Sequence, residues 1–582
     1  MRKILATLMA LVMALALMVP AAWADGEKIE TYQLPDDLTG KTVVLHTNDV
    51  HGAVAKYAKV AALKADFEAK GATVILVDAG DFSQGTVYVS LSKGASAIDL
   101  MNATGYNLAT LGNHEFDYGY PQLEDNLSKA DFDVLCCNIL DAAGKHMFAP
   151  SGIVNVDGLK VGFIGVNTPE SQTKANPALI KGLSWLAEDA MYDEVSADAA
   201  ALKADGADVV IALTHLGVDS ESEPNRSTDL MTKVTGVDFC IDGHSHTVMT
   251  ADAENLMTQS TGTALAYVGV VVIDNTTKTI EDNGLFDLAA YENEDATVKA
   301  LADKLIADVD AEYDVVFAKT EVRLNGDRDP GNRTEETNLG NLITDSMLWA
   351  INTQAELTVP AENVVAITNG GGIRATIEAG NVTKKDVNTV LPFGNTVAVV
   401  YVTGAELLEA LEASTYCTPT AIGGFPQIAG MKITIDTTKE YDPYADTYPG
   451  STYYGPATIQ RVTINEVNGK PFDVRATYAV VTNNFTAAGG DTYFAFASAS
   501  GQFDTGLPLD EVLMQYITEE LNGVITAEQY GQTEGRITIV LPEEKPDEKP
   551  ESPKTADAGV LVYGLVALMS ASGAVVVGKK RK

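Results

Sequence analysis

Between residues 41 and 250 the chain repeats one pattern: a short apolar run, a polar stretch, and often a segment with helical periodicity. The apolar runs span 42–47, 73–78, 107–112, 133–139, 159–166, 208–214 and 237–242. They are continuous rather than alternating, which is typical of strands that are covered on both faces. The pattern therefore predicts a layered α/β domain with a mixed sheet, which we place at 25–290.

A chain of 582 residues is too long for a single hydrophobic core. Apolar residues recur at helical spacing over 293–315, which predicts a linker helix within 291–316. Further apolar runs (ENVVAITNG, TVAVVYVTG, TYAVVTNNF) and the helical segment GAELLEALEAS predict a second α+β domain at 317–540. The Tyr/Pro/Gly-rich stretch 441–456 in that domain predicts a long loop.

The N-terminus has the order of a secretory signal. Arg2 and Lys3 precede an apolar run at 4–18, and Ala22-Trp23-Ala24 supplies the small residues of a cleavage site. We therefore expect residues 1–24 to be a signal peptide. The alternative is a membrane anchor, for which the run is short.

The C-terminus predicts a surface anchor. Residues 541–554 are rich in Pro, Glu and Lys and predict a disordered spacer. Residues 559–577 are apolar over about the length of a bilayer span, and a basic tail follows. The order of 552–582 resembles a Gram-positive sorting signal, although Ser552 and Ala556 depart from its usual Leu-Pro-x-Thr-Gly. The resemblance implies sortase and peptidoglycan as partners; the alternative is a transmembrane anchor. Both place the protein outside the cell.

Charge and cysteine usage exclude some functions. The chain has 80 Asp+Glu against 40 Lys+Arg and a net charge of −40, which disfavours a polymeric nucleic acid as partner. An anionic substrate requires local cations that reverse this field. Four cysteines are too few for a disulfide scaffold. The adjacent Cys136 and Cys137 lie in an apolar run and predict a buried strand, not a metal site or a nucleophile.

Polar clusters directly follow five of the predicted strands and contain five of the seven histidines. Loops at the carboxyl ends of parallel strands converge on one crevice, and Asp, Asn and His all ligate divalent metals. Each residue alone is compatible with a turn, a cap or a core position, but together they predict a metal centre. The clusters are Asp49-Val50-His51, Gly80-Asp81, Gly112-Asn113-His114-Glu115-Phe116-Asp117, Thr214-His215 and Gly243-His244-Ser245-His246.

The order D-x-H, G-D, G-N-H-E-F-D, T-H and G-H-x-H resembles the calcineurin-like metallophosphoesterases, and in particular the secreted 5′-nucleotidase and UDP-sugar hydrolase family. The resemblance covers about residues 40–540. It implies a four-layer α/β metallophosphoesterase domain with mixed sheets, followed by an α+β substrate domain. It also implies two divalent cations per chain, such as Zn, Mn or Co. One would be held by Asp49, His51, Asp81 and His246, and the other by Asp81, Asn113, His215 and His244.

In this resemblance Asp81 bridges the two cations, which activate a water for in-line attack on phosphorus. His246 is a departure, because family members often have Gln or Asn at this position. Relatives that act on cyclic phosphodiesters also have His there, which keeps that substrate class open.

His114 and Asp117 predict a catalytic pair. They are three residues apart, so one helical turn would place them side by side. A carboxylate fixes the tautomer of an imidazole and favours its cationic form. The resemblance gives the pair the role of stabilising the transition state and the leaving group; the alternative is a structural pair.

Residues of the second domain predict a phosphate subsite. Arg374 ends a Gly-rich segment, where the backbone can approach a ligand closely and a guanidinium can bind phosphate with two hydrogen bonds. The resemblance implies that Arg333, Asn369 and Arg374 hold the phosphate and its neighbouring groups. A surface ion pair is the alternative for Arg333.

Three further residues predict nucleoside binding. The resemblance implies that Phe393 and Phe485 sandwich the nucleobase, far from the reacting phosphate, and that Asp491 holds the ribose hydroxyls. Any base offers a π-face on which a ring can stack. Core packing is the alternative for each phenylalanine.

The sequence thus predicts an extracellular, metal-dependent phosphoester hydrolase that releases phosphate from nucleoside 5′-monophosphates. Alternatives within the class are a UDP-sugar diphosphatase and a 2′,3′-cyclic-nucleotide 2′-phosphodiesterase with 3′-nucleotidase activity. A wall-anchored adhesin without catalysis is the alternative from another class, but it does not explain a complete set of metal ligands.

Overall fold

The computed structural model describes residues 31–354, 357–499 and 501–542. The described residues up to Val540 belong to one compact unit. The predicted signal peptide (1–24), the spacer beyond Pro542 and the predicted sorting signal (552–582) lie outside the described residues. Within the described ranges, no helix combines the length and the apolar character that crossing a bilayer requires.

The N-terminal half contains two six-stranded mixed sheets. Antiparallel strands extend a parallel core at one edge of the first sheet and at both edges of the second. The first has the order β14 (Thr279–Asp287), β13 (Tyr267–Asp274), β1 (Lys41–Thr47), β2 (Thr73–Asp78), β3 (Leu108–Ala109), β4 (Asp133–Val134). The second has the order β11 (Val248–Met249), β12 (Thr258–Thr261), β10 (Phe239–Ile241), β9 (Val209–His215), β7 (Leu159–Asn167), β6 (Ser151–Val156).

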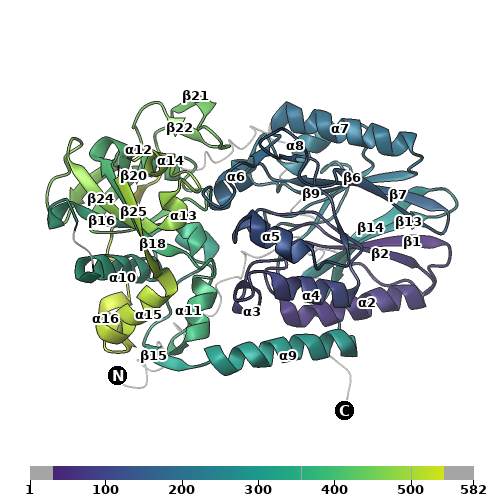
Figure 1. Ribbon diagram of the computed structural model, residues 1–582, viewed down its shortest axis with the longest axis horizontal. Helices are drawn as coiled ribbons and strands as arrows, with labels where there is room; N and C mark the ends of the chain where they lie inside the picture. Colours follow the sequence, from purple (N-terminus) through teal and green to yellow (C-terminus); the bar gives the residue numbers. More distant parts are fainter. Residues whose placement is uncertain (1–30, 355–356, 500, 543–582) are drawn as a thin grey trace, which may run out of the picture. The chain divides into compact units, whose positions relative to one another are not determined.

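These sheets form the middle of a four-layer arrangement. Buried side chains such as Val44 of β1 and Phe163 of β7 belong to one core cluster between the sheets. The helices α2 (Tyr57–Ala69) and α4 (Ala95–Thr104) cover the outer face of the first sheet, and α7 (Glu188–Ala204) covers that of the second. Figure 1 shows these layers, with α7 and α2 on opposite sides of the strands. Because both faces are covered, the inner strands are apolar throughout, as their sequences predict.

The second half is built on a five-stranded sheet with the order β19 (Pro426–Ala429), β16 (Val364–Asn369), β24 (Thr477–Asn483), β18 (Thr396–Thr403), β25 (Gly501–Pro508). One core cluster joins this sheet to α10 (Asn338–Gln354) and α15 (Leu509–Glu519), and another joins its opposite face to α12 (Gly404–Ser414). The linker helix α9 spans Ala296–Tyr313, inside the range that the sequence predicts.

Smaller elements complete the unit. Two three-stranded sheets have the orders β17 (Gly380–Thr383), β15 (Val316–Thr320), β26 (Val524–Ile525) and β23 (Val462–Val467), β20 (Met431–Asp436), β27 (Ile537–Val540). A strand pair joins β5 (Ile139–Leu140) to β8 (Ser184–Trp185). The shorter helices are α3 (Val87–Ser90), α5 (Tyr120–Leu127), α6 (Ser171–Lys174), α8 (Ser227–Lys233), α11 (Lys384–Val390), α13 (Asn484–Ala487), α14 (Phe494–Ala497) and α16 (Ala527–Tyr530).

The structure corrects the expectation of a long loop at 441–456. This stretch contains an antiparallel pair, β21 (Pro443–Thr447) and β22 (Tyr454–Pro456). Tyr448 and Tyr453 are buried beside it, and the Tyr448 ring stacks on Phe494 with centroids 4.6 Å apart. The tyrosine rings therefore provide the apolar surface that anchors the hairpin. The Pro and Gly content of the stretch predicts turns, but it does not indicate this packing.

Candidate metal centre and substrate cavity

The predicted metal-binding residues meet at the carboxyl ends of the parallel strands. Asp49 and His51 follow β1, Asp81 follows β2, Asn113 follows β3, His215 ends β9, and His244 and His246 follow β10. Five of them have positive φ angles: 48° at Asp49, 45° at His51, 62° at Asp81, 77° at His244 and 57° at His246. A non-glycine residue in this region costs about 1–3 kcal/mol, and such residues cluster at functional sites.

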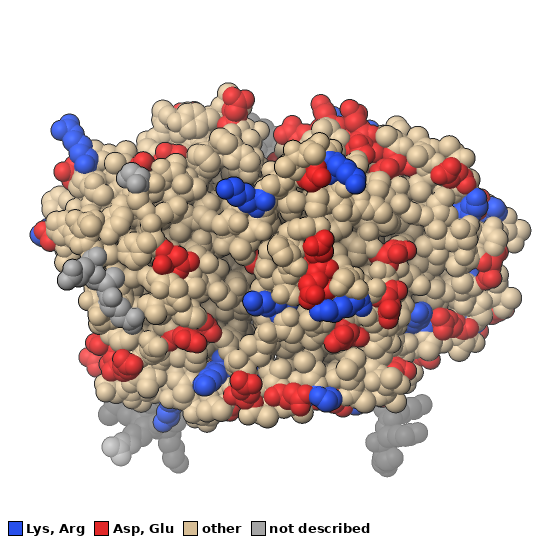
Figure 2. All heavy atoms as spheres, viewed as in Figure 1, with Lys and Arg blue, Asp and Glu red and all other residues tan. Residues whose placement is uncertain are grey.

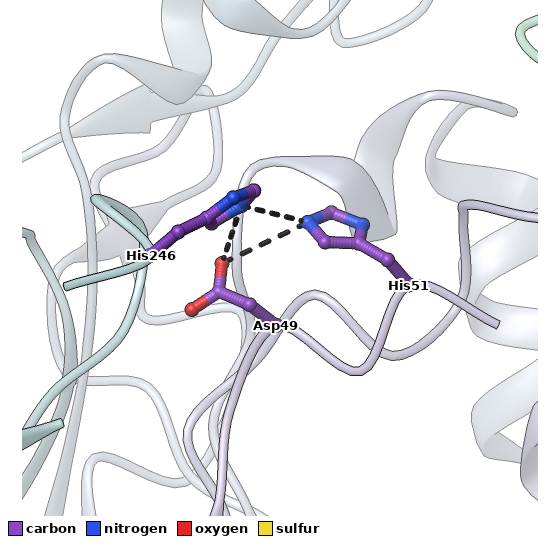
Figure 3. A group of neighbouring side chains, drawn as sticks. All are labelled: Asp49, His51 and His246. Atoms are coloured by element: carbon purple, nitrogen blue, oxygen red, sulfur yellow. Dashed lines mark hydrogen bonds and ion pairs between the residues drawn. The ribbon is translucent and has the colours of Figure 1, made fainter. Parts of the chain in front are cut away.

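Asp49, His51 and His246 form one group of potential ligands (Figure 3). The Nε2 atoms of the two histidines are 3.1 Å apart, and His246 Nε2 is 3.4 Å from Asp49 Oδ1. His51 Nδ1 lies 3.1 Å from the Gln84 carbonyl, to which a ring N–H can donate. That bond leaves a lone pair on His51 Nε2, on the side that faces Asp49.

Asp81 and His215 form a second group with Asp49. His215 Nε2 lies 3.1 Å from Asp81 Oδ2, while its Nδ1 lies 2.6 Å from the Ala79 carbonyl. Burial by itself would raise the pKa of Asp81, but the charge of His215 holds it well below its ordinary value, so the carboxylate is ionised. Asn113 Oδ1 is buried and has no hydrogen-bond partner.

These donors fit divalent cations. In each group the carboxylate oxygens and imidazole nitrogens lie within 4.8 Å of one another, and Asn113, with its unpartnered buried amide oxygen, lines the same cavity as Asp81. Such a set of donors is suited to a metal of intermediate softness. Asp49, His51 and Asp81 each take part in two of the three groups found among the described residues, and His244 is in none of these groups. The bridging position of Asp81 therefore stays a prediction. The third group contains His51, Asp81 and His114, although the sequence does not predict His114 as a ligand.

Glu115 holds the loop that carries Asp81, a role that the sequence does not predict. Its buried carboxylate accepts hydrogen bonds from the backbone N–H groups of Asp81 (2.8 Å), Phe82 (2.9 Å) and Gly112 (2.6 Å). Burial, then the charge of Asp81, raises the pKa of Glu115 to about 7. The signal was its position inside the G-N-H-E-F-D segment.

The predicted pair of His114 and Asp117 is present. His114 Nδ1 lies 2.6 Å from Asp117 Oδ2, on a 3₁₀ turn over His114–Phe116. The expectation of a cationic imidazole is not met in the free protein. Burial lowers the pKa of His114 to about 3 against the opposing effect of Asp81, and burial raises the pKa of Asp117. In the free protein the imidazole of His114 is therefore neutral beside Asp117.

A single cavity joins the metal residues to the second domain. It encloses about 980 Å³ of space, part of it open to solvent. Its lining includes Asp81, Asn113, His114, Asp117, His244 and His246, together with all six predicted substrate residues, Arg333, Asn369, Arg374, Phe393, Phe485 and Asp491. The structure thus brings the two predicted sets of residues to one place.

The cavity also gathers positive charge in an acidic protein. Figure 2 shows acidic side chains scattered over the displayed face, with several near α7. The cavity, by contrast, is lined by Lys174, Arg328, Arg333 and Arg374. Asp81, Asp117, Asp219 and Asp491 line the same cavity, so a local field that favours an anionic substrate requires bound metal cations as well as these basic side chains. Arg328 and Lys174 were not among the substrate residues that the sequence predicts. Arg328 could have been found from its position five residues before Arg333.

The two predicted base-binding rings have different surroundings. Phe393 stacks on the His114 ring, with centroids 5.6 Å apart, and the Arg374 guanidinium lies 5.7 Å from its centroid. Phe485 is 9% exposed and packs against Gly490, where a Cβ atom would lie 2.4 Å from the ring. Phe393 is therefore not far from the reacting centre, contrary to the expectation from the sequence.

Asn369 and Asp491 belong to one hydrogen-bonded network. Asn369 Nδ2 donates to Asp491 Oδ2 at 2.9 Å, and Asn483 Nδ2 donates to Asn369 Oδ1 at 3.0 Å. The Asp491 backbone N–H donates to the Thr173 carbonyl of the first domain at 2.7 Å. The predicted phosphate and ribose residues are thus positioned by each other and by the loop after β7.

Comparison with known proteins agrees with this architecture. Residues 42–248 match the calcineurin-like phosphoesterase family, and residues 316–498 match the 5′-nucleotidase C-terminal domain. The chain is a two-domain member of the 5′-nucleotidase family. It has the predicted fold, and it is a metal-dependent phosphoester hydrolase, so the adhesin alternative is not supported.

Individual relatives cover most of this family member. It is 30% identical over 88% of its length to the trifunctional nucleotide phosphoesterase of Bacillus subtilis, but it spans only 36% of that protein. It is 28% identical to a 5′-nucleotidase of Vibrio cholerae, over 85% of this chain and 93% of the relative. The crystal structure of a 5′-nucleotidase precursor from Thermus thermophilus superposes with a TM-score of 0.71 and 29% identity, covering 87% of this chain and all of that one.

Proposed function

We propose that this protein hydrolyses nucleoside 5′-monophosphates to nucleoside and phosphate with two divalent cations. The observation that carries the proposal is the cavity in which arginines, two phenylalanines and the His114–Asp117 pair face the metal residues. Relatives of similar length that are named 5′-nucleotidases support it. The native metals remain a choice among Zn, Mn and Co.

The residues divide the work as follows. Asp49, His51, Asp81 and His246 would hold one cation and Asp81, Asn113, His215 and His244 the other. A pair of such cations binds phosphate oxygens, neutralises developing charge and supplies a nucleophilic water at neutral pH.

Around that centre, Arg333 and Arg374 orient the phosphate with charge-assisted hydrogen bonds. His114, held by Asp117, faces the departing nucleoside oxygen and stabilises its charge. Phe485 and Phe393 contact the base, and Asp491 accepts hydrogen bonds from the ribose. Binding energy from these remote contacts fixes the phosphate for attack.

A second candidate is hydrolysis of nucleoside 2′,3′-cyclic phosphates or UDP-sugars. Two observations favour keeping it: His246 lies within the metal cluster, and the Bacillus subtilis relative is named a trifunctional nucleotide phosphoesterase. The experiment is phosphate release from AMP, 3′-AMP, 2′,3′-cyclic AMP and UDP-glucose, each with Mn²⁺, Zn²⁺ or Co²⁺. We expect AMP to have the highest kcat/KM. A higher value for a cyclic phosphate or UDP-glucose would replace the proposal.

We also propose that the protein works at the cell surface, exported by residues 1–24 and anchored by residues 552–582. The support is the sequence order of the two ends. Mass spectrometry of the protein released from wall fractions tests this: we expect a mature N-terminus at Asp25 and a C-terminus at Thr555 linked to peptidoglycan. An intact C-terminus in the membrane fraction would favour the transmembrane anchor.

A further inference from the structure

Glu170 is a buried carboxylate that contacts a predicted metal residue but has no part in the predicted site. It follows β7 and is 1% exposed. Its Oε2 lies 3.0 Å from His244 Nε2 and 3.3 Å from Lys174 Nζ. The carboxylate is thus held between an imidazole and an ammonium group, and these contacts stabilise its charge in a buried position.

This contact determines which atom of His244 can bind a cation. A carboxylate only accepts hydrogen bonds, so His244 Nε2 carries the proton and Nδ1 keeps the lone pair. The backbone of His244 is fixed as well, because its N–H donates to Asp49 Oδ2 at 3.0 Å and its φ is 77°. Ring and backbone are therefore both held before a cation arrives.

We propose that Glu170 is a positioning residue, which fixes the tautomer and the orientation of His244 for one of the two cations. Carboxylates behind metal-binding histidines act in this way, and their loss typically costs about 10–100-fold in metal affinity. The inference rests on the proposed dinuclear centre, but not on the identity of the substrate.

The segment around Glu170 extends the effect into the cavity. Lys174 and Asn176 line the cavity, and the Thr173 carbonyl accepts the N–H of Asp491. A single short segment thus contacts His244 on one side and the second domain on the other. Displacement of Glu170 would therefore disturb a metal site and the loop beside the substrate together.

Manganese binding to the full chain tests the proposal. The metal-free protein and its Glu170→Gln variant are titrated with Mn²⁺ by calorimetry and by electron paramagnetic resonance. The Gln amide keeps the size of Glu but can donate a proton to His244 Nε2, which would select the wrong tautomer. We expect one of two affinities to fall about 10–100-fold, and the exchange-coupled two-ion signal to require correspondingly more Mn²⁺. The Mn²⁺ affinity of Glu170→Asp should lie between that of the unsubstituted protein and that of Glu170→Gln.

Glu412→Gln is the matched control. Glu412 is also fully buried and accepts backbone hydrogen bonds from Arg461 and Val462, but it belongs to the second domain. It should lower thermal stability without changing Mn²⁺ affinity. In a His244→Ala background, Glu170→Gln should have no further effect on Mn²⁺ binding.

Three results would overturn the inference. They are unchanged affinities in Glu170→Gln, equal weakening of both sites, and a full effect that persists in the His244→Ala background. Fewer than two Mn²⁺ sites in the unsubstituted protein would instead reject the dinuclear proposal, and this inference with it.

Discussion

His114 is the residue in which three parts of the cavity meet. Its Nδ1 contacts Asp117, its ring stacks on Phe393, and its backbone N–H donates to Asp81 Oδ1 at 2.9 Å. Its ring also lies near enough to His51 and Asp81 to share a group of potential ligands with them. Asp117 holds Nδ1 and leaves Nε2 open, and an open Nε2 can either stabilise a leaving group or bind a cation.

His114→Ala should lower kcat by roughly 10²–10⁴, the scale of a positioned proton-transfer group, while both metal ions stay bound. The loss should be smaller with p-nitrophenyl phosphate, whose leaving group needs little stabilisation. Steady-state kinetics and metal analysis of the same preparation check both points. A variant that has lost metal would show that His114 is a ligand.

Phe485→Ala should raise KM for AMP by roughly ten- to a hundredfold, because a stacked base is worth about 1–3 kcal/mol and 1.4 kcal/mol is a factor of ten. The KM for p-nitrophenyl phosphate, which has no base, should change little. Phe485 is a cleaner probe than Phe393, which touches His114. Equal losses on both substrates would mean that Phe485 is a packing residue.

At the scale of elements, helix α7 carries an acid against the edge of the second sheet. Asp198 Oδ1 lies 3.4 Å from Ser151 Oγ of β6, and its Oδ2 is buried without a hydrogen-bond partner. Burial, then the charge of Glu194, raises the pKa of Asp198 from 3.8 to about 6. Its contribution to stability is therefore present below pH 3.8 and is lost as the pH rises through 6.

Asp198→Asn should raise Tm at pH 7, because it removes an ionised carboxylate from a partly buried position, and should change Tm little at pH 4. A gain of about 1 kcal/mol corresponds to roughly 2–4 °C for a domain of this size. Thermal unfolding at the two pH values measures this, with the exposed Asp193→Asn on the same helix as the control. An identical shift at both pH values would contradict the assignment.

At the scale of the whole molecule, a strongly acidic chain folds two of its carboxylates into one buried place. Asp49 is fully buried and Asp81 is 2% exposed, and both contact His215. Histidines alone offset the negative charge of two buried carboxylates only in part, whereas a divalent cation offsets it directly. We therefore expect the stability of the described unit to depend on metal.

Addition of Mn²⁺ to the metal-free protein should raise Tm in a concentration-dependent way, since binding at a hundred times Kd stabilises a fold by about 2.7 kcal/mol. A chelator should reverse the shift, and Asp81→Ala should greatly reduce it. Differential scanning fluorimetry over a range of Mn²⁺ concentrations checks this. An Asp81→Ala protein with the same Mn²⁺-dependent shift would argue against the bridging position.

Local sequence was enough to predict much of the fold and the metal centre. Continuous apolar runs predict buried parallel strands, and the polar residues that end them lie at the carboxyl edge of their sheet. Asp49 and Asp81 do so in the first sheet, and His215 does so in the second. The spacing of His114 and Asp117 likewise predicted a contact that one helical turn provides. These predictions succeed because each depends on residues that are close in sequence or on a periodicity that covers a whole element.

Only the tertiary structure decided the contacts between distant segments. Glu170 and His244 are 74 residues apart in sequence, and Phe393 reaches His114 from another domain. The short pairing of β3 and the hairpin at 441–456 likewise depend on neighbouring segments. The protonation of His114 depends on how much water packing excludes. Burial and long-range packing are properties of the assembled chain, so the sequence determined the chemistry available to this protein and the tertiary structure determined which groups use it together.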